Sequence, residues 1–365
     1  MSSDTRYMAL ALSLGRRGLG RTWPNPAVGC VIVAEGRVIG RGFTQPGGRP
    51  HAETEALAQA GAHARGADVY VSLEPCAHEG RTGSCAKALI EAQVGRVFVA
   101  ATDPDPRVNG SGMAMLEQAG IKVVQGICEN QARRDNAGFF ARVELDRPFL
   151  TLKLANSFDG RIATGTGESQ WITGSHARRS VHAMRARHDA VIVGGGTARK
   201  DNPALTVRGL GMEWQPTRVV VSRRLDVPLM GNLARTAHEV PVVLCHGHDA
   251  DPALIQTWQG LGATLKPCQS TGTQLDPVDV LRQLARHGLT RLFCEGGSAL
   301  AASLLEADLV DELVGYSAGV VIGAEGLPSV GALGLSHLSD APRFELARYE
   351  RIAGDVLHVW RRPTG

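Results

Sequence analysis

The sequence predicts an α/β protein of two domains, residues 1–146 and 147–365. Three observations support this class. A chain of 365 residues is longer than a typical single domain. Short runs rich in Val, Ile and Leu alternate with runs of helical periodicity, as in layered α/β sheets. A helical run over residues 129–140 ends near Pro148, after which the alternation starts again, so we place the boundary there. We expect three α/β/α layers in the first domain.

Composition narrows the possible functions. Hydrophobic residues make up 43% and charged residues 21% of the chain, which is ordinary for a globular protein. The net charge of +3 is spread evenly over the two domains, so no basic domain for nucleic acid emerges. Seven cysteines at irregular spacing indicate a reducing cytoplasm rather than a disulfide framework. The N-terminus lacks a signal-peptide pattern, and no apolar run approaches the roughly 18 residues that span a bilayer.

The elements of the first domain follow from local signals. Asp4 is placed to cap the first helix, Gly61 stops the second, and Glu35-Gly36 closes a hairpin. The predicted helices cover residues 4–14, 54–60, 86–92, 113–119 and 129–140, and the predicted strands cover residues 30–33, 38–40, 69–73, 97–101 and 121–124.

Two loops of this domain are candidates for ligand contacts. Pro24-Asn25-Pro26 fixes the backbone just before the first strand, and therefore the position of the Asn25 amide. Taken alone, this segment is typical of a surface turn. A loop rich in Pro and Gly over residues 102–112 follows a strand, which is a usual place for ligand contacts.

The stretch from His51 to Cys85 carries the residues of a metal site. His51 and Glu53 lie at the start of the second helix, Cys76 follows the strand over residues 69–73, and Cys85 precedes the third helix. An imidazole and two thiols are the ligands of a three-ligand catalytic zinc, whose fourth position stays open for water. Zinc lowers the pKa of that water to about 7, while a neighbouring base carries the protons of attack on an amidine carbon. Glu53 is placed to be that base.

This motif resembles the signature of the zinc nucleotide deaminases, His-x-Glu followed by Pro-Cys-x-x-Cys. Eight residues, 77–84, separate the cysteines here instead of two. The longer spacing is similar to the pyrimidine deaminases of riboflavin biosynthesis. The resemblance implies that zinc binds the three ligands, that Glu53 is catalytic and that Asn25 forms a hydrogen bond with the substrate. It also implies that Arg81 faces the substrate phosphate, although a solvated loop charge explains Arg81 equally well.

Two glycine-rich turns in the second domain favour a nucleotide. Gly194-Gly195-Gly196-Thr197 and Glu295-Gly296-Gly297-Ser298 each follow a predicted strand, where glycines let a phosphate approach backbone N–H groups. Each turn alone is typical of a tight connection, but two in one domain indicate a nucleotide. Between them, a strand ends at Ser222-Arg223-Arg224, and basic residues at such a strand end can hold a 2′-phosphate. We therefore expect NADPH rather than NADH.

The remaining elements of the second domain are predicted less sharply. The predicted strands cover residues 149–155, 189–193, 219–221, 291–294, 309–322 and 344–360, and the predicted helices cover residues 178–187 and 299–306.

Several segments resemble the reductase partner of the riboflavin deaminases. They are residues 149–155, 156–162 and 167–173, and residues 201–208, which are similar to that family's Asp-Pro-x-Leu-Thr-x-Arg. The resemblance implies a dihydrofolate-reductase-like fold. Together with the glycine turns and the strand end, it gives the residues expected to bind NADPH: Ala155, Trp171, Thr197, Asp201, Ser222, Gly297 and Ser298. The residues expected to bind the substrate are Lys153, Ser169, Arg185, Leu205, Arg208 and Glu295. Because a carboxylate at a glycine turn opposes bound phosphates, we expect Glu295 to address the substrate ring or ribose.

These observations predict a bifunctional enzyme of riboflavin biosynthesis. Its first domain is expected to deaminate 2,5-diamino-6-ribosylamino-4(3H)-pyrimidinone 5′-phosphate with zinc. Its second is expected to reduce the ribosyl group to ribityl with NADPH, giving 5-amino-6-ribitylamino-uracil 5′-phosphate. We expect phosphorylated pyrimidines as partners, no nucleic acid, no membrane, a cytoplasmic location and a homo-oligomer, either a dimer or a tetramer.

Three alternatives stay open at this point. A nucleic-acid deaminase with an accessory domain requires a basic groove lined by aromatic residues, whereas aromatics make up only 5% of the chain. A binding module with structural zinc requires a fourth protein ligand, which His78 or Cys30 could supply. In the third alternative only one half works, because Glu79 adds negative charge to the loop between the cysteines.

Overall fold

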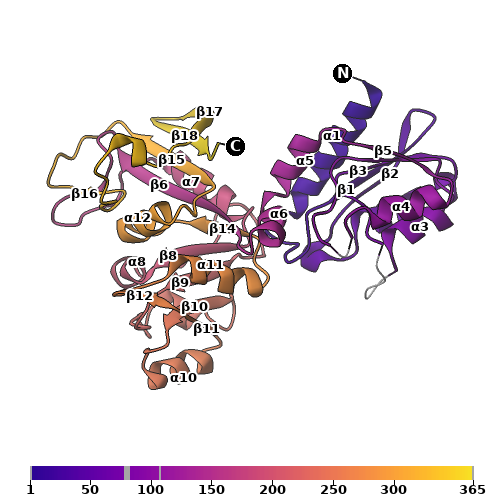
Figure 1. The fold of residues 1–365 in the computed structure, drawn as a ribbon. Coiled ribbons are helices and arrows are strands. Elements are labelled where there is room, and N and C mark those ends of the chain that lie inside the picture. Colours follow the sequence, from indigo (N-terminus) through magenta and orange to yellow (C-terminus); the bar gives the residue numbers. More distant parts are fainter. Residues whose placement is uncertain (1, 78–82, 107, 364–365) are drawn as a thin grey trace. The chain divides into compact units, whose positions relative to one another are not determined.

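The computed structural model describes residues 2–77, 83–106 and 108–363. The chain divides into two compact units, Met1–Asp146 and Arg147–Gly365. Each unit has its own sheet flanked by helices and its own hydrophobic core, so the predicted α/β class is confirmed (Figure 1).

The N-terminal unit is a five-stranded sheet in the order β2-β1-β3-β4-β5. β1 runs antiparallel to β2 and β3, while β3, β4 and β5 are parallel. The strands are β1 Gly29–Ala34, β2 Arg37–Phe43, β3 Asp68–Val71, β4 Arg96–Val99 and β5 Lys122–Gln125. The helices are α1 Ser3–Gly15, α2 Ala52–Ala60, α3 Cys85–Glu91, α4 Ser111–Gln118, α5 Glu129–Asp135 and α6 Ala137–Glu144.

Glycines let two helices approach opposite faces of this sheet. A Cβ at Gly29 would lie 1.9 Å from the Ala11 carbonyl oxygen of α1, and one at Gly42 would lie 2.1 Å from the Ala52 carbonyl oxygen of α2. Gly42 pairs with Cys30, the neighbour of Gly29, and successive strand residues face opposite sides. Helices therefore cover both faces, which gives the predicted three layers.

Two local predictions are corrected here. The cap of α1 is Ser2, whose Oγ accepts from the Thr5 N–H at 3.2 Å, and not Asp4. Asp4 instead accepts a hydrogen bond from the Tyr70 hydroxyl at 2.7 Å. The helical run over residues 129–140 is interrupted at Asn136, which lies between α5 and α6. The Asn136 side chain forms hydrogen bonds with both the backbone N–H and the carbonyl oxygen of Ala27.

The C-terminal unit is built on a nine-stranded sheet in the order β11-β10-β9-β8-β14-β6-β15-β18-β17. The first seven strands in this order are parallel, and β18 and β17 close the sheet in antiparallel fashion. These strands are β6 Phe149–Ser157, β8 Ala190–Gly194, β9 Thr217–Val221, β10 Val242–Gly247, β11 Thr264–Cys268, β14 Arg291–Cys294, β15 Glu312–Ala318, β17 Glu345–Ile352 and β18 Asp355–Arg361.

Within the described part of this unit there are also six α-helices, a short 3-10 helix at Leu338–Asp340 and two short ladders. The helices are α7 Ser175–Arg185, α8 Gly195–Asp201, α9 Asn232–Arg235, α10 Pro252–Gly260, α11 Pro277–Arg286 and α12 Ser298–Glu306. The ladders join β7 Arg161–Ala163 to β16 Leu327–Pro328, and β12 Ser270–Thr271 to β13 Gln274–Leu275. Because β6, β8, β9 and β14 are parallel, their carboxyl ends meet at one edge of the sheet, where ligands of open α/β sheets bind.

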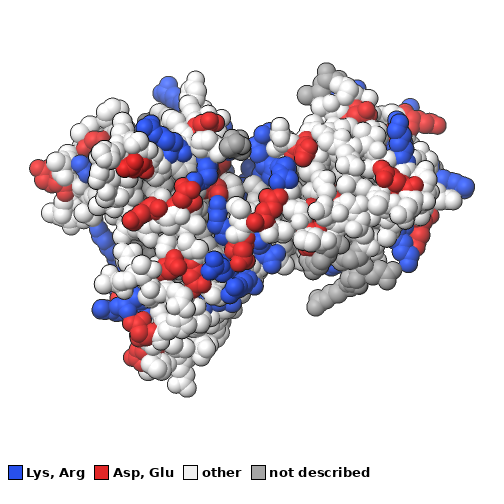
Figure 2. Space-filling view, in the orientation of Figure 1, with Lys and Arg blue, Asp and Glu red and all other residues white. Residues whose placement is uncertain are grey.

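Two surface properties bear on the expected partners. Among the described residues, no helix combines the length and apolar character needed to cross a bilayer. On the face drawn in Figure 2, basic and acidic side chains occur together on each unit.

Candidate active sites

Three predicted metal ligands meet at one end of the N-terminal sheet. His51 is the residue before α2, Cys85 is the first residue of α3, and Cys76 lies in the segment after β3. The His51 Nδ1 atom lies 3.2 Å from Cys85 Sγ and 3.7 Å from Cys76 Sγ. The three donor atoms all lie within 4.8 Å of one another, a spacing that suits the tetrahedral coordination of Zn²⁺.

Local hydrogen bonds hold the two cysteines together despite the eight residues between them. Ser84 caps α3 by accepting from the Lys87 N–H, and its hydroxyl donates to the Cys76 carbonyl oxygen at 2.7 Å. The backbone N–H groups of Cys85 and Ala86 donate to the sulfur and the carbonyl oxygen of Cys76. The start of α3 is thereby fixed against Cys76. Arg81, together with His78 and Glu79, lies outside the described residues.

The charges of the cluster favour a metal. Hydrogen bonds from the Cys85 thiol and from His51 lower the pKa of Cys76 to about 4, against the effect of burial. The pKa of Cys85 is raised, because its thiol donates to Cys76 and is buried. A thiolate therefore forms at Cys76 readily, and a bound cation would replace the proton that Cys85 shares with it.

Glu53 lies beside this cluster in the first turn of α2. Its side chain is only 3% exposed, and burial raises its pKa to about 7 while His51 acts in the opposite direction. A carboxyl group that titrates near neutral pH can both accept and return a proton. This is the property required of the predicted base.

A cavity of about 100 Å³ opens onto His51, Glu53 and Cys76, and Asn25 is among its lining residues. The Asn25 amide is held by a hydrogen bond from its Nδ2 to the Gly48 carbonyl oxygen, at 3.1 Å. A Cβ at Gly48 would lie 2.0 Å from that nitrogen, so a glycine is needed there. From the sequence we expected the neighbouring prolines to fix this amide. The hydrogen bond to Gly48 was not predicted.

Asp103 and Asp105, from the loop over residues 102–112 that was expected to contact a ligand, also line the cavity. Sequence reasoning did not single out four other lining residues, Thr44, Arg49, Glu74 and Phe139. Burial raises the pKa of Asp103 to about 6. The only sign in the sequence that Asp103 contacts a ligand was its place in the loop after the strand over residues 97–101.

Glu74 positions that loop. Its buried carboxylate accepts hydrogen bonds from the backbone N–H groups of Asp103, Gly110 and Gly112, at 3.3, 2.9 and 3.0 Å. A Cβ at Gly112 would lie 1.8 Å from the Pro75 carbonyl oxygen. The loop over residues 103–112 is therefore packed tightly against the residue that precedes Cys76.

The second site is a cavity of about 450 Å³ at the carboxyl ends of β6, β8 and β14. Eight of the residues predicted for substrate or cofactor line it, namely Lys153, Ala155, Ser169, Thr197, Asp201, Glu295, Gly297 and Ser298. Lys200 also lines it and was missed, because no sequence signal distinguishes it from an ordinary solvated lysine.

Glu295 holds two cations at this cavity. Arg185 donates to both of its carboxylate oxygens, at 2.5 and 3.0 Å, and Lys153 Nζ lies 3.6 Å away. Burial acts to raise the pKa of Glu295, but the charges of Arg185 and Lys153 prevail and lower it to about 2. Glu295 therefore orients both cations, and its expected contact with the substrate ring or ribose stays a prediction.

Four predicted residues, Arg185 and the three that follow, are not among those lining the cavities described in this unit. Leu205 is 3% exposed and its side chain packs in the hydrophobic core, and its contact with the substrate stays a prediction. Trp171 is 68% exposed, with the Arg178 guanidinium 4.4 Å from its ring centroid. Arg208 is exposed, and its backbone N–H donates to His182 Nδ1 at 3.2 Å.

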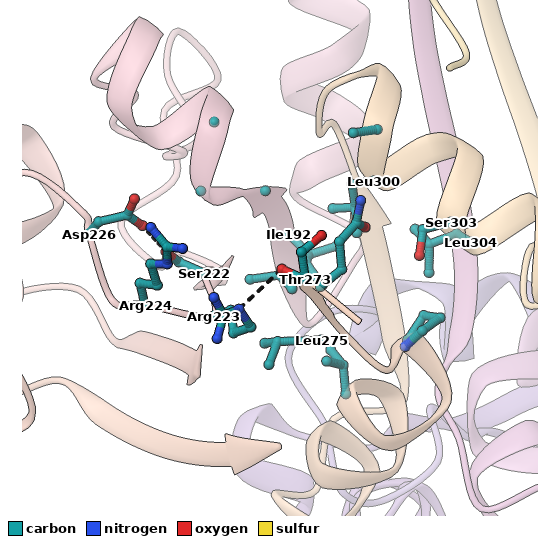
Figure 3. A pocket seen from close by; sticks show the side chains of 18 of the residues that line it. Ile192, Ser222, Arg223, Arg224, Asp226, Thr273, Leu275, Leu300, Ser303 and Leu304 are labelled. Carbon is teal, nitrogen blue, oxygen red and sulfur yellow. Dashed lines mark hydrogen bonds between the residues drawn. The ribbon is translucent and has the colours of Figure 1, made fainter. Parts of the chain in front are cut away.

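An adjoining cavity of about 350 Å³ contains the predicted Ser222 together with Arg223 and Arg224 (Figure 3). Gly194, Gly196, Ala299 and Leu300 line both cavities. The two cavities therefore adjoin where β8 passes into α8, as the binding of an extended dinucleotide requires.

The chain matches known proteins over nearly its full length. Residues 1–101 match the cytidine and deoxycytidylate deaminase zinc-binding region, and residues 148–358 match the RibD C-terminal domain. The riboflavin biosynthesis protein RibD of Escherichia coli (strain K12) is 39% identical over 363 residues, or 98% of this chain and 99% of that protein. This chain belongs to the RibD family of riboflavin biosynthesis proteins. RibD of Aquifex aeolicus is 38% identical over 98% of both chains.

Solved RibD structures agree with this assignment. Form 1 of Acinetobacter baumannii RibD has a TM-score of 0.89 at 37% identity, covering 99% of each chain. A Thermotoga maritima diaminohydroxyphosphoribosylaminopyrimidine deaminase/5-amino-6-(5-phosphoribosylamino)uracil reductase has a TM-score of 0.87 at 32% identity and the same coverage. The predicted family, fold class and enzyme type are confirmed: this RibD chain is a zinc-binding deaminase and a reductase. Zn²⁺ and NADPH are the cofactors of those two domain types.

Proposed function

We propose that the chain deaminates 2,5-diamino-6-ribosylamino-4(3H)-pyrimidinone 5′-phosphate in its N-terminal unit. The deaminated product then has its ribosyl group reduced to ribityl with NADPH in the C-terminal unit. The observation that carries this proposal is the His51, Cys76 and Cys85 cluster beside buried Glu53, in one chain with a reductase unit that has two adjoining cavities. The substrate class is that of the Thermotoga maritima relative.

In the first step, His51, Cys76 and Cys85 hold the zinc ion. When bound, zinc supplies a water molecule activated for attack on the amino-bearing ring carbon. Glu53 would accept the first proton of that water and deliver it to the adjacent ring nitrogen. It would then accept the remaining proton of the added hydroxyl and deliver it to the leaving amine, so that ammonia departs and a carbonyl remains. Its pKa of about 7 suits both directions of transfer. Asn25 orients the pyrimidine through its fixed amide.

In the second step, the protein binds and orients two phosphorylated molecules. NADPH supplies a hydride to C1′ of the opened ribose or its imine. We propose that the backbone N–H groups of Gly297 and Ser298, at the start of α12, bind the cofactor phosphates. The other proposed cofactor contacts are Ala155, Trp171, Thr197, Asp201 and Ser222. Lys153 is proposed to donate a hydrogen bond to the substrate from its position beside Glu295.

We propose that Arg185 and Arg208 hold the substrate phosphate, assisted by Ser169. His182, whose Nδ1 accepts from the Arg208 backbone N–H, has its pKa lowered by burial and by the charges of Arg185 and Arg208. The region around His182 is thus positive, as a phosphate dianion requires. Glu295 fixes the direction of the Arg185 guanidinium. Because the Leu205 side chain is buried, we propose that Leu205 contacts the substrate through its backbone.

We also propose that the chain acts as a homodimer in a reducing cytoplasm. Three large apolar side chains are exposed on neighbouring strands, Leu346 and Tyr349 on β17 and Val356 on β18. They form an apolar surface suited to binding a second copy of the chain. The seven cysteines, all of them described, are unpaired, as expected in a reducing compartment. Sedimentation of the wild type and of Tyr349→Lys tests the dimer: the variant should be monomeric, and an unchanged dimer would place the interface elsewhere.

Exchange of Glu53 tests the proposed chemistry. The Glu53→Gln variant should retain zinc but release ammonia at least about 100-fold more slowly, because the proton carrier is lost. It should still oxidise NADPH when the deaminated substrate is supplied. Loss of zinc together with undiminished ammonia release would contradict the roles assigned to Glu53 and to the ligands.

A further inference from the structure

We infer that the C-terminal unit selects NADPH over NADH through Arg199 and Arg224, and that Asp226 is the counterion that the cofactor's 2′-phosphate displaces from Arg199. This inference rests on the proposed NADPH-dependent reduction and deepens it by naming the residues of cofactor selection. It sharpens the expectation from the sequence, which pointed to the whole Ser222-Arg223-Arg224 segment.

The adjoining cavity has two chemically distinct sides. Figure 3 shows Ser222, Arg224 and Asp226 together on one side, and Leu300, Ser303 and Leu304 on the other. Further apolar side chains in its lining are Ile192, Leu275, Val280 and Leu281. An adenine ring fits the apolar side, and its ribose then faces the charged side.

Arg223 is already engaged by the protein. Its guanidinium forms an ion pair with Asp249, and its Nε donates to the Thr273 carbonyl oxygen at 3.1 Å. Thr273 lies in the turn between β12 and β13, so Arg223 fixes this turn against the end of β9. Binding of a phosphate by Arg223 would require these contacts to break, which makes it the least suited of the arginines in this cavity.

Arg199 is suited to exchange its partner. Its Nη1 lies 2.7 Å from Asp226 Oδ1, and the two side chains are 47% and 49% exposed. An ion pair this exposed contributes little net stability, so a doubly charged phosphate can replace the carboxylate. Arg224 is exposed, lines the same cavity and adds a second guanidinium.

Asp226 explains why Arg199 is needed. An acidic residue near the end of the second strand of such a fold can hold the ribose 2′-hydroxyl of NADH. Here Arg199 and the Ser222 hydroxyl, at 2.6 Å, both bond Asp226 Oδ1. Without Arg199, the carboxylate is released toward the ribose, where it favours a hydroxyl and repels a phosphate.

Calorimetry on the full-length protein tests this with two ligands that differ only in the 2′-phosphate, adenosine 2′,5′-bisphosphate and adenosine 5′-monophosphate. Arg199→Ala and Arg224→Ala should each weaken the bisphosphate about 10- to 100-fold, the loss expected for a charge-assisted hydrogen bond. The monophosphate should stay within about twofold of the wild type. Asp226→Asn should tighten only the bisphosphate, because it removes a negative charge. Arg235→Ala, an exposed arginine not among the residues that line the described cavities, is the control and should change neither ligand.

Two results would overturn the inference. Equal losses for both ligands in Arg199→Ala and Arg224→Ala would mean that these residues shape the cavity without recognising the phosphate. Unchanged binding of both ligands would mean that the 2′-phosphate binds elsewhere. Failure of the proposed NADPH-dependent reduction would give a different result. In that case the wild-type enzyme would oxidise NADH as readily as NADPH, which contradicts the cofactor assignment itself. A double variant of Arg199 and Arg224 that keeps the NADPH preference contradicts only the inference.

Discussion

Two buried carboxylates, Glu53 and Glu295, show how environment decides the role of a residue. Burial raises the pKa of Glu53 to about 7, and the charge of His51 only partly offsets it. Glu295 is also buried, but Arg185 and Lys153 lower its pKa to about 2. Glu53 can therefore move protons at neutral pH, whereas Glu295 is a fixed negative charge that orients its two cations.

Replacement of Glu295 tests this second role. Glu295→Gln should lower the free energy of unfolding by roughly 2 kcal/mol, because two partly buried cations lose their counter-charge. It should also raise the KM for the reductase substrate, since Arg185 loses its orientation. Chemical denaturation and NADPH oxidation measure the two effects. Glu306→Gln, an exposed change at the end of α12, is the control and should leave both unchanged.

His188 makes stability depend on pH. Burial lowers its pKa to about 3, and its ring nitrogens contact the Met184 carbonyl oxygen and the Thr151 hydroxyl. The unfolded chain takes up a proton near pH 6.5, while the folded chain does not. The contribution of His188 is therefore complete above pH 6.5 and is lost as the pH falls toward 3. Buried Asp189, whose pKa is raised, acts in the opposite direction.

We expect the wild type to lose stability between pH 6.5 and 5 more steeply than His188→Gln, by up to about 1.4 kcal/mol per pH unit. Denaturation of both proteins at several pH values measures the difference, in which the other titrating groups cancel. Parallel curves would contradict the neutral, buried state of His188.

At the scale of elements, the deaminase site depends on contact between segments that are distant in sequence. Glu74 accepts from backbone N–H groups of the loop over residues 103–112, and Gly112 packs against Pro75. The loop therefore packs against the two residues that precede Cys76, and Asp103 of the same loop lines the cavity.

Gly112→Ala should disturb this support, because its Cβ would lie 1.8 Å from a backbone oxygen. We expect a loss of roughly 1–3 kcal/mol in stability and a lower zinc content, with weaker ammonia release and unchanged reductase activity. Zinc analysis and the two assays measure this. Gly83→Ala, whose Cβ would meet nothing within 4 Å, is the matched control. Full zinc content and deaminase activity in Gly112→Ala would argue against the support.

Elements with strong local signals were predictable from the sequence. The strands at Cys30, Val97 and Arg291 are found close to where β-branched runs predict them. The glycine turn predicted over residues 194–197 is instead a direct passage from β8 into α8, which begins at Gly195. The zinc ligands were predictable because their chemistry restricts residue type and spacing. The cap at Ser2, the break at Asn136, the partners of Glu295 and the burial of Leu205 depend on tertiary contacts, which no local pattern encodes.

At the scale of the whole molecule, two compact units carry the two chemistries, each with its own core. The described metal ligands all belong to the first unit. Removal of zinc by a chelator should therefore abolish ammonia release, while NADPH oxidation with the deaminated substrate continues within about twofold. Restoring zinc should restore deamination. A parallel loss of both activities on chelation would contradict the separation of the two sites.

The most direct test of the central claim follows both steps in one reaction. The zinc-loaded wild-type chain receives the diaminopyrimidine phosphate and NADPH, while ammonia and the absorbance of the reduced nicotinamide are recorded together. We predict about one NADPH oxidised for each ammonia released, with oxidation starting only after ammonia appears and absent in Glu53→Gln. Ammonia release without NADPH oxidation, or oxidation that precedes it, would contradict a deaminase and a reductase acting in sequence on one chain.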